Sequence, residues 1–325
     1  MYKSILLAII ITIFAGCGQP DVPQEPAWFT SPPKDFNKFY AVGAAYDESK
    51  AKNIAALSLR DRLLSDLNNA FKKKGHKLSL TKENRLSNIL QLNEHRANTI
   101  SLRTLNVEKT AQFNSKTLVL VSILKKDLFE SLSKVSDKNF QASQAKHTKI
   151  QSAVAIERFA ITKEILLGYD ELASDIQFKQ NILSTYNPND EFEYLNRLDS
   201  DYKKLKEDVS VYILTDANSI PFYKSVKEAI LATGLSISKK PKTDDSIKLL
   251  ISSKTTNDDE YTFKKAKTLI KFTTYNTKRE KIKFRQHTFS GKSTKTYNEA
   301  KSQSVLHLKY RLGKENIFNF IGVID

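Results

Sequence analysis

The sequence predicts an α+β protein with two small domains, each with helices on an antiparallel sheet, joined by a long helical connector. The 325 residues have an ordinary globular composition, with 40% hydrophobic and 10% aromatic residues, and this length is typical of two domains. Alternating apolar and polar residues, typical of half-exposed strands, occur on both sides of a polar helical stretch at about 127–207. Five of the eight prolines lie within 18–35, which predicts an extended tether before the first domain.

The first seventeen residues have the layout of an export signal. Lys3 supplies a positive charge, residues 5–14 are nearly all apolar, and two small residues precede Cys17. The apolar run is too short to span a bilayer, which takes about 20 residues. This layout predicts a lipoprotein signal peptide at 1–16 and acylation of the Cys17 thiol, for example with palmitate. An ordinary signal peptide and an uncleaved N-terminal anchor are the alternatives, and each of them also exports the body of the protein.

Cys17 is the single cysteine of the chain, so the fold is not a disulfide scaffold. Two or more acyl chains anchor a protein stably, which predicts attachment to a membrane through residue 17 and a tether at 17–35. No later stretch is apolar enough to span a bilayer. We therefore expect a lipid-anchored protein on the periplasmic side of the outer membrane, with exposure at the cell surface as an alternative.

The first domain is predicted at 36–126 with the order β-α-β-β. Its expected elements are a strand at 36–45, an amphipathic helix from Asp47 to about Lys74, and strands at 99–110 and 116–125. Asn114-Ser115 suits the turn between the last two strands. Gly43 is predicted to allow a close contact between strand and helix, and Trp28 is expected to dock the end of the tether into the core.

The connector is predicted at 127–207 and the second domain at 208–325. In the connector, apolar residues from Leu128 to Leu166 predict a long helix that ends near Gly168. The second domain has the predicted order β-α-β-β-β-β-α. Its last helix is expected to contain Ala300 and Leu312 and to extend toward Phe320.

No catalytic or metal-binding motif is present. The chain has no phosphate-binding loop, no dinucleotide fingerprint and no nucleophile elbow, and its five histidines are scattered without metal-ligand spacing. A calcium loop at Asp258–Glu260 fails because the glycine and the spaced ligands are missing. The sequence therefore predicts a protein that is not an enzyme and that has no cofactor and no metal.

The net charge of +16 raises the question of an anionic partner. Nucleic acid is excluded by the predicted compartment, which leaves anionic lipid or glycan. The candidate partner- or polyanion-binding residues are Lys271, Lys281, Lys283 and Arg285, which are expected on the solvent side of antiparallel strands. An ordinary solvated sheet face is the alternative, and an AT-rich genome would also explain the abundance of lysine.

Short motifs near the N-terminus resemble the LPP-twenty lipoprotein family over about residues 26–135. They are Pro26-Ala27-Trp28-Phe29, the strand end Phe39–Ala45 and the alanine-rich helix from Ser49. The resemblance implies an outer-membrane or surface lipoprotein with an α+β domain, and it supplies no catalytic residues. By the order of its elements, the segment 209–325 resembles the periplasmic domains of flagellar assembly protein T and of lipoprotein activators of cell-wall synthases.

Together these patterns favour a non-enzymatic periplasmic lipoprotein that acts as a scaffold or assembly factor of a cell-envelope machine such as the flagellar motor. The alternatives are a regulator of a cell-wall synthase and a binder or carrier of anionic lipid or glycan. The two protein-binding hypotheses both require envelope protein partners, and the sequence does not decide between them.

Overall fold

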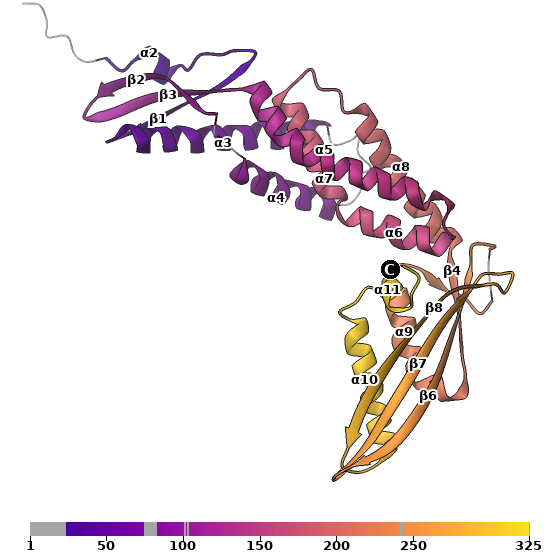
Figure 1. Cartoon of the computed structure of the whole chain (residues 1–325). Helices are drawn as coiled ribbons and strands as arrows, with labels where there is room; N and C mark the ends of the chain where they lie inside the picture. Colours follow the sequence, from indigo (N-terminus) through magenta and orange to yellow (C-terminus); the bar gives the residue numbers. More distant parts are fainter. Residues whose placement is uncertain (1–23, 75–82, 101, 103, 241–242, 325) are drawn as a thin grey trace, which may run out of the picture. The chain divides into compact units, whose positions relative to one another are not determined.

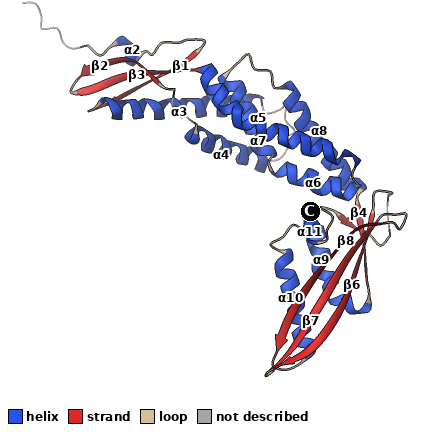
Figure 2. Cartoon of the chain, in the orientation of Figure 1, coloured by secondary structure: helices blue, strands red, loops and turns tan. Residues whose placement is uncertain are grey.

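The computed structural model describes residues 24–74, 83–100, 102, 104–240 and 243–324 (Figure 1). The predicted signal peptide, Cys17 and the first residues of the tether lie outside these ranges. Contacts divide the described residues into an N-terminal unit, within 24–74, 90–135 and 177–186, and a C-terminal unit, within 83–89, 136–176 and 187–324. Both units combine helices with a sheet, which confirms the predicted α+β class (Figure 2).

The N-terminal unit contains a three-stranded antiparallel sheet in the order β1-β3-β2. Its strands are β1 (Lys38–Ala45), β2 (Asn106–Phe113) and β3 (Lys116–Leu124), and its helices include α3 (Glu48–Lys74) and part of α4 (Glu83–Thr99). Helix α3 packs on β1 and β3, and Leu59 and Leu63 share a buried cluster with Val119 and Val121. The strand predicted at 99–110 begins later, at residue 106, because α4 continues to Thr99.

Two turn and packing predictions in this unit are confirmed. Asn114 and Ser115 join β2 to β3, and both have positive φ angles, of 46° and 60°, as a two-residue hairpin turn of this type requires. A Cβ built on Gly43 would overlap the carbonyl oxygen of Ala51 and lie 2.5 Å from the nitrogen of Ala55. Strand and helix backbones therefore meet at this glycine, as the sequence predicted.

Strand β3 is buried on both of its faces. Val119 and Val121 point into the core that α3 covers, whereas Leu118 and Leu120 alternate with them and are only 2% and 1% exposed. The short helix α2 (Ala27–Thr30) packs against β3. Trp28 of α2 is half-buried and forms an edge-to-face pair with Phe29 at 6.0 Å. The end of the tether is thus folded onto the sheet rather than extended throughout, and Trp28 is not a member of the core cluster.

Four helices lie between the two sheets in the sequence. They are α5 (Lys125–Lys149), α6 (Ala155–Leu167), α7 (Tyr169–Ile182) and α8 (Asn189–Asp208). The single helix predicted up to Gly168 is divided into α5 and α6, because the 3-10 turn Ile150–Ser152 is followed by extended backbone at residues 153 and 154. Ile156 and Phe159 of α6 join the core of the C-terminal unit.

The C-terminal unit contains a five-stranded mixed sheet in the order β5-β4-β6-β7-β8. Its strands are β4 (Ser210–Thr215), β5 (Ser236–Ile237), β6 (Ile247–Glu260), β7 (Phe263–Tyr275) and β8 (Lys281–Ser293), and its helices include α9 (Ile220–Ala232), α10 (Tyr297–Leu312) and α11 (Ile317–Phe320). Strands β6, β7 and β8 are antiparallel, whereas β4 pairs in parallel with both β5 and β6. Helix α9 makes the crossover between β4 and β5.

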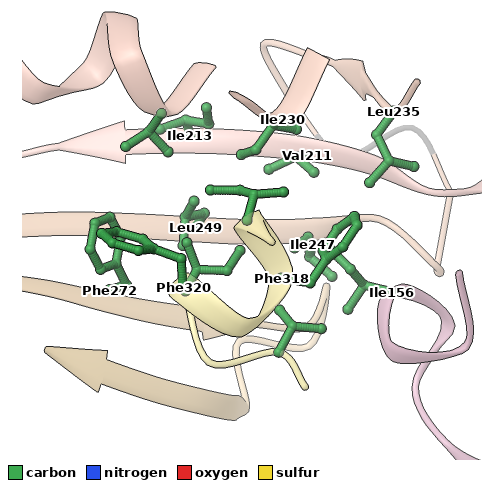
Figure 3. Packing of buried hydrophobic residues seen from close by; sticks show 14 of the residues in the cluster. Ile156, Val211, Ile213, Ile230, Leu235, Ile247, Leu249, Phe272, Phe318 and Phe320 are labelled. Atoms are coloured by element: carbon green, nitrogen blue, oxygen red, sulfur yellow. The ribbon is translucent and has the colours of Figure 1, made fainter. Parts of the chain in front are cut away.

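The last residues of the chain fill the core of this sheet. Figure 3 shows Phe318 and Phe320 of α11 among the side chains of the sheet, and the Phe320 ring lies 5.5 Å from that of Phe272. The structure corrects the prediction of one long final helix, since α10 ends at Leu312 and a second helix starts after Asn316, whose side chain accepts the Phe318 N–H. The separate turn is what brings Phe318 and Phe320 over the sheet.

Candidate ligand-binding face of the C-terminal sheet

One face of the C-terminal sheet is covered by helices and the other is open. Inner-face residues such as Val211, Leu249 and Phe272 belong to the same buried cluster as Phe222 of α9 and Leu308 of α10. Side chains alternate along each strand, so the residues between them point to the opposite side. On β6 to β8 these intervening residues are half-buried or exposed, and we call this side the open face.

Seven lysines of β6 to β8 lie on the open face. Two of them, Lys265 and Lys292, form ion pairs with Glu260, and we call the other five the open-face lysines. They are Lys248 and Lys254 of β6, Lys267 and Lys271 of β7, and Lys281 of β8. All except the half-buried Lys248 are exposed. Among the residues that the structure describes, no carboxylate forms an ion pair with any of these five lysines. The open face therefore carries uncompensated positive charge.

The strand pairing places three of these lysines in a row. Lys267 lies opposite Thr256, Lys254 opposite Leu269, and Lys271 opposite Ser252, so the three follow one another in steps of two residues. At about 3.4 Å per residue each step is about 7 Å. The row runs along the sheet and is not a compact cluster.

Aromatic rings lie at one end of the open face. The ammonium of Lys248 lies 5.6 Å from the centre of the Tyr275 ring, and that of Lys281 lies 4.5 Å from the centre of the Phe284 ring. The Phe284 side chain is 45% exposed, although large apolar residues in strands usually face the core. This end of the face combines flat apolar surface with positive charge.

The opposite end of the face, at the hairpin between β6 and β7, is electrically neutralised. Glu260 lies 2.8 Å from Lys265 and 3.0 Å from Lys292 on this face, and Asp259 lies 2.8 Å from Lys264 on the inner side of the same hairpin. The hydrogen bonds from Lys265 and Lys292 lower the pKa of the Glu260 carboxyl. The paired charges at the hairpin contrast with the unpaired open-face lysines.

The structure separates the four residues that the sequence predicted for this site. Lys271 and Lys281 lie on the open face, since Lys281 pairs with Tyr275. Lys283 pairs with the buried Thr274 and Arg285 with the buried Phe272, which places both on the inner face. The cause is a bulge, because Lys281 and Lys283 oppose consecutive residues of β7 and thus point to opposite sides. The prediction that all four share a solvent face is wrong.

Sequence analysis did not include Lys248, Lys254 or Lys267 among its candidates. Lys248 and Lys254 have the opposite parity to the buried Ile247, Leu249 and Ile251 of β6, and Lys267 lies between the buried Ala266 and Thr268 of β7. That period of two was the signal that could have found them.

A second candidate site is a cavity of about 560 Å³ in the C-terminal unit. Its lining includes Lys146, Glu157 and Glu164 of the helices, together with Asn316 and Asn319 near the C-terminus. Lys146 and Glu164 form an ion pair of 2.8 Å across its wall. The mixed charge of the lining selects no ligand class, whereas the open-face lysines all carry charge of one sign.

Two histidines of the C-terminal unit have lowered pKa values, because one ring is buried and the other half-buried. Burial lowers the pKa of His147, whose Nε2 lies 3.3 Å from Asp201. Burial also lowers the pKa of His287, whose Nε2 donates to the carbonyl oxygen of Phe320 at 2.7 Å. The His287 ring is stacked on the Phe320 ring at 4.1 Å. Both imidazoles have structural partners within the fold.

Two further features are absent from the described ranges. No three His, Cys, Asp or Glu side chains there are grouped in a way that could hold a metal ion. No helix in the same ranges is long and apolar enough to cross a membrane.

Comparison with known proteins establishes no family for the chain. No family model and no curated protein matches it. A solved structure of a secreted protein from Helicobacter pylori is similar to 86% of this chain and 97% of its own, with a TM-score of 0.38 and 10% identity. A minor lipoprotein from Acinetobacter baumannii is similar to 34% of this chain and 92% of its own, with a TM-score of 0.28 and 11% identity. The resemblance to the LPP-twenty family stays a prediction.

Proposed function

We propose that this protein is an exported lipoprotein of the cell envelope, anchored through acylated Cys17. The observation that carries the proposal is the position of the single cysteine directly after a short apolar run and two small residues. Placement on the periplasmic side of the outer membrane is part of the proposal, and surface exposure is its alternative.

The folded end of the tether supports an anchoring role. Ala27, the first residue of the helix that packs against β3, is ten positions after Cys17. Ten extended residues span at most about 35 Å. An acylated Cys17 would therefore hold the N-terminal sheet within about 35 Å of the bilayer surface, where the unit could contact other envelope components.

We propose further that the anchored protein is a non-enzymatic scaffold or assembly factor of an envelope machine, such as a flagellar motor. Its two α+β units offer surfaces for partner proteins, and regulation of a cell-wall synthase is an alternative of the same kind. Binding of an anionic lipid or glycan is a second candidate function, favoured by the unpaired charge of the open face.

Acylation is tested by growing cells that express the full chain with radiolabelled palmitate. The wild-type protein should carry the label and sediment with membranes, and Cys17→Ser should lose both properties. A matched control combines Cys17→Ser with Gln19→Cys, which keeps one thiol in the chain but displaces it from the cleavage site. This double variant should also stay unlabelled. A Cys17→Ser protein that still sediments with membranes would show that the anchor lies elsewhere.

The scaffold role is tested by crosslinking in intact cells, followed by identification of the captured molecules. A reproducible envelope protein that crosslinks to the wild type, and weakly to the unanchored Cys17→Ser variant, is the expected result. Recovery of lipid or glycan alone would overturn the scaffold proposal.

A further inference from the structure

We propose that the open face of the C-terminal sheet binds an extended acidic polysaccharide, whose anionic groups lie along the open-face lysines. The proposal rests on the proposed envelope location and adds to it a class of ligand. Three properties of the face carry it: the unpaired charge, the linear arrangement and the chemistry of the residues between the lysines.

Among the described residues, the open-face lysines have no carboxylate partners, and three of them lie along a line. Lys267, Lys254 and Lys271 follow one another in a row, and Lys248 and Lys281 lie opposite each other across Tyr275 at its end. Steps of about 7 Å along the strands match a linear polymer with repeated charges better than a single small anion. A lone phosphate would contact one or two of these lysines and leave the remaining ones unpaired.

The residues between the lysines offer hydrogen-bonding groups of the kind that sugars require. Ser252, Gln286 and Thr288 lie on the open face, where hydroxyl and amide groups can both donate and accept. At the end of the row, Tyr275 and Phe284 add flat apolar surface on which the face of a sugar ring can pack. An acidic polysaccharide uses all three features.

The composition of the face argues against a protein partner at this site. Cores of protein interfaces are depleted in lysine and serine and enriched in aromatic residues, methionine and arginine. The open face instead carries five unpaired lysines with serine, threonine and glutamine side chains between them, and the two leucines of β6 to β8 on this face, Leu250 and Leu269, are half-buried.

A flat bilayer is also a poor match. Strands β6, β7 and β8 are 13 to 14 residues long, and strands in a sheet twist along their length. A twisted face brings only part of the lysine row close to a planar surface, whereas a flexible polymer can follow the row.

The test compares two triple variants of the full chain in nonionic detergent, with fluorescein-labelled polygalacturonate as the probe. Lys254→Gln/Lys267→Gln/Lys271→Gln removes the row. The control, Lys224→Gln/Lys309→Gln/Lys314→Gln, removes three exposed lysines from α9, α10 and the residues after α10, on the helical side of the same unit. Both variants lower the net charge equally, so a difference between them depends on position.

We expect the row variant to bind at least tenfold more weakly than the wild type, and the control variant to stay within about threefold. Binding by the wild type should weaken as NaCl is raised from 50 to 300 mM, because salt screens exposed charges. Neutral dextran should not compete. If the row variant does not fold, as judged by circular dichroism, Lys271→Gln and Lys309→Gln are compared in its place.

Three results would overturn the proposal. They are an equal loss in both variants, no binding of polygalacturonate by the wild type, and row-dependent binding to phosphatidylglycerol vesicles without any binding of the polysaccharide. None of them bears on acylation of Cys17, which the palmitate experiment tests separately.

Discussion

Gly43→Ala should destabilise the N-terminal unit, because the strand and helix backbones meet at this position. The new Cβ would lie 2.5 Å from the nitrogen of Ala55 and overlap the carbonyl oxygen of Ala51. Carbon–nitrogen contacts under about 3 Å do not occur between non-bonded atoms, so the helix would have to move by about 1 Å or more. That movement would open the packing of Leu59 and Leu63 against the sheet.

The expected cost follows from overpacking of a core. An extra methyl group in a well-packed core costs about 1–3 kcal/mol, and backbone atoms on the opposing side favour the upper end of that range. A loss of about 3 kcal/mol corresponds to a decrease in melting temperature of about 6–12 °C for a chain of this size. Urea unfolding followed by circular dichroism would measure the change directly.

Gly168→Ala is the matched control for this substitution. Gly168 follows α6 with a φ of −88°, and the nearest atom to a built Cβ is the Ile165 carbonyl oxygen at 3.6 Å, an ordinary contact. Alanine there should leave stability unchanged or raise it by about 0.4–1 kcal/mol. If Gly43→Ala were as stable as Gly168→Ala, the close helix–strand contact would be refuted.

Three further predictions concern other parts of the fold. Ser115→Gly should stabilise the β2–β3 turn by about 0.5–1 kcal/mol in urea unfolding, because serine has a φ of 60° there and glycine adopts that conformation without strain; an unchanged or lowered stability would contradict the turn geometry. Phe320→Ala should lower the free energy of unfolding by about 3–5 kcal/mol, because the Phe320 ring is 1% exposed and packs on Phe272. As the control, Tyr310→Ala should change the free energy of unfolding by less than about 0.5 kcal/mol, because the Tyr310 side chain is 61% exposed. The free energy of unfolding should fall as the pH drops from 7.5 to 5.5. Burial lowers the pKa of His147 and His287 below 6.5 in the native state, so the unfolded chain binds more protons in this range. His287→Asn should reduce the dependence of the unfolding free energy on pH, and an unchanged dependence would show that His287 does not contribute.

Local pattern was sufficient for much of the fold. The order of strands and helices in 208–325 follows from apolar periodicity, and the structure has the same order with α11 added after α10. The turn at Asn114-Ser115 and the packing at Gly43 were also predictable, because each depends on the conformational freedom of one or two residues. These features are encoded by neighbouring residues, which is why the sequence was enough.

Pairing between distant strands could not be predicted from periodicity. The parallel alignment of β4 with β6 depends on the crossover through α9, and a period of two does not distinguish strand directions. The assignment of Ile156 and Phe159 to the C-terminal core likewise depends on where α6 packs, not on its own pattern.

The sequence by itself determined the excess of lysine and was enough to predict the α+β class, the export signal and the lipid site at Cys17. Only the tertiary structure decided which lysines share a surface. A single bulge between β7 and β8 puts Lys281 on the open face and Lys283 on the inner face, and strand pairing brings Lys254 of β6 beside Lys267 and Lys271 of β7. The physical reason is that side-chain direction in a sheet reverses at every residue, so one unpaired residue inverts the face of all that follow.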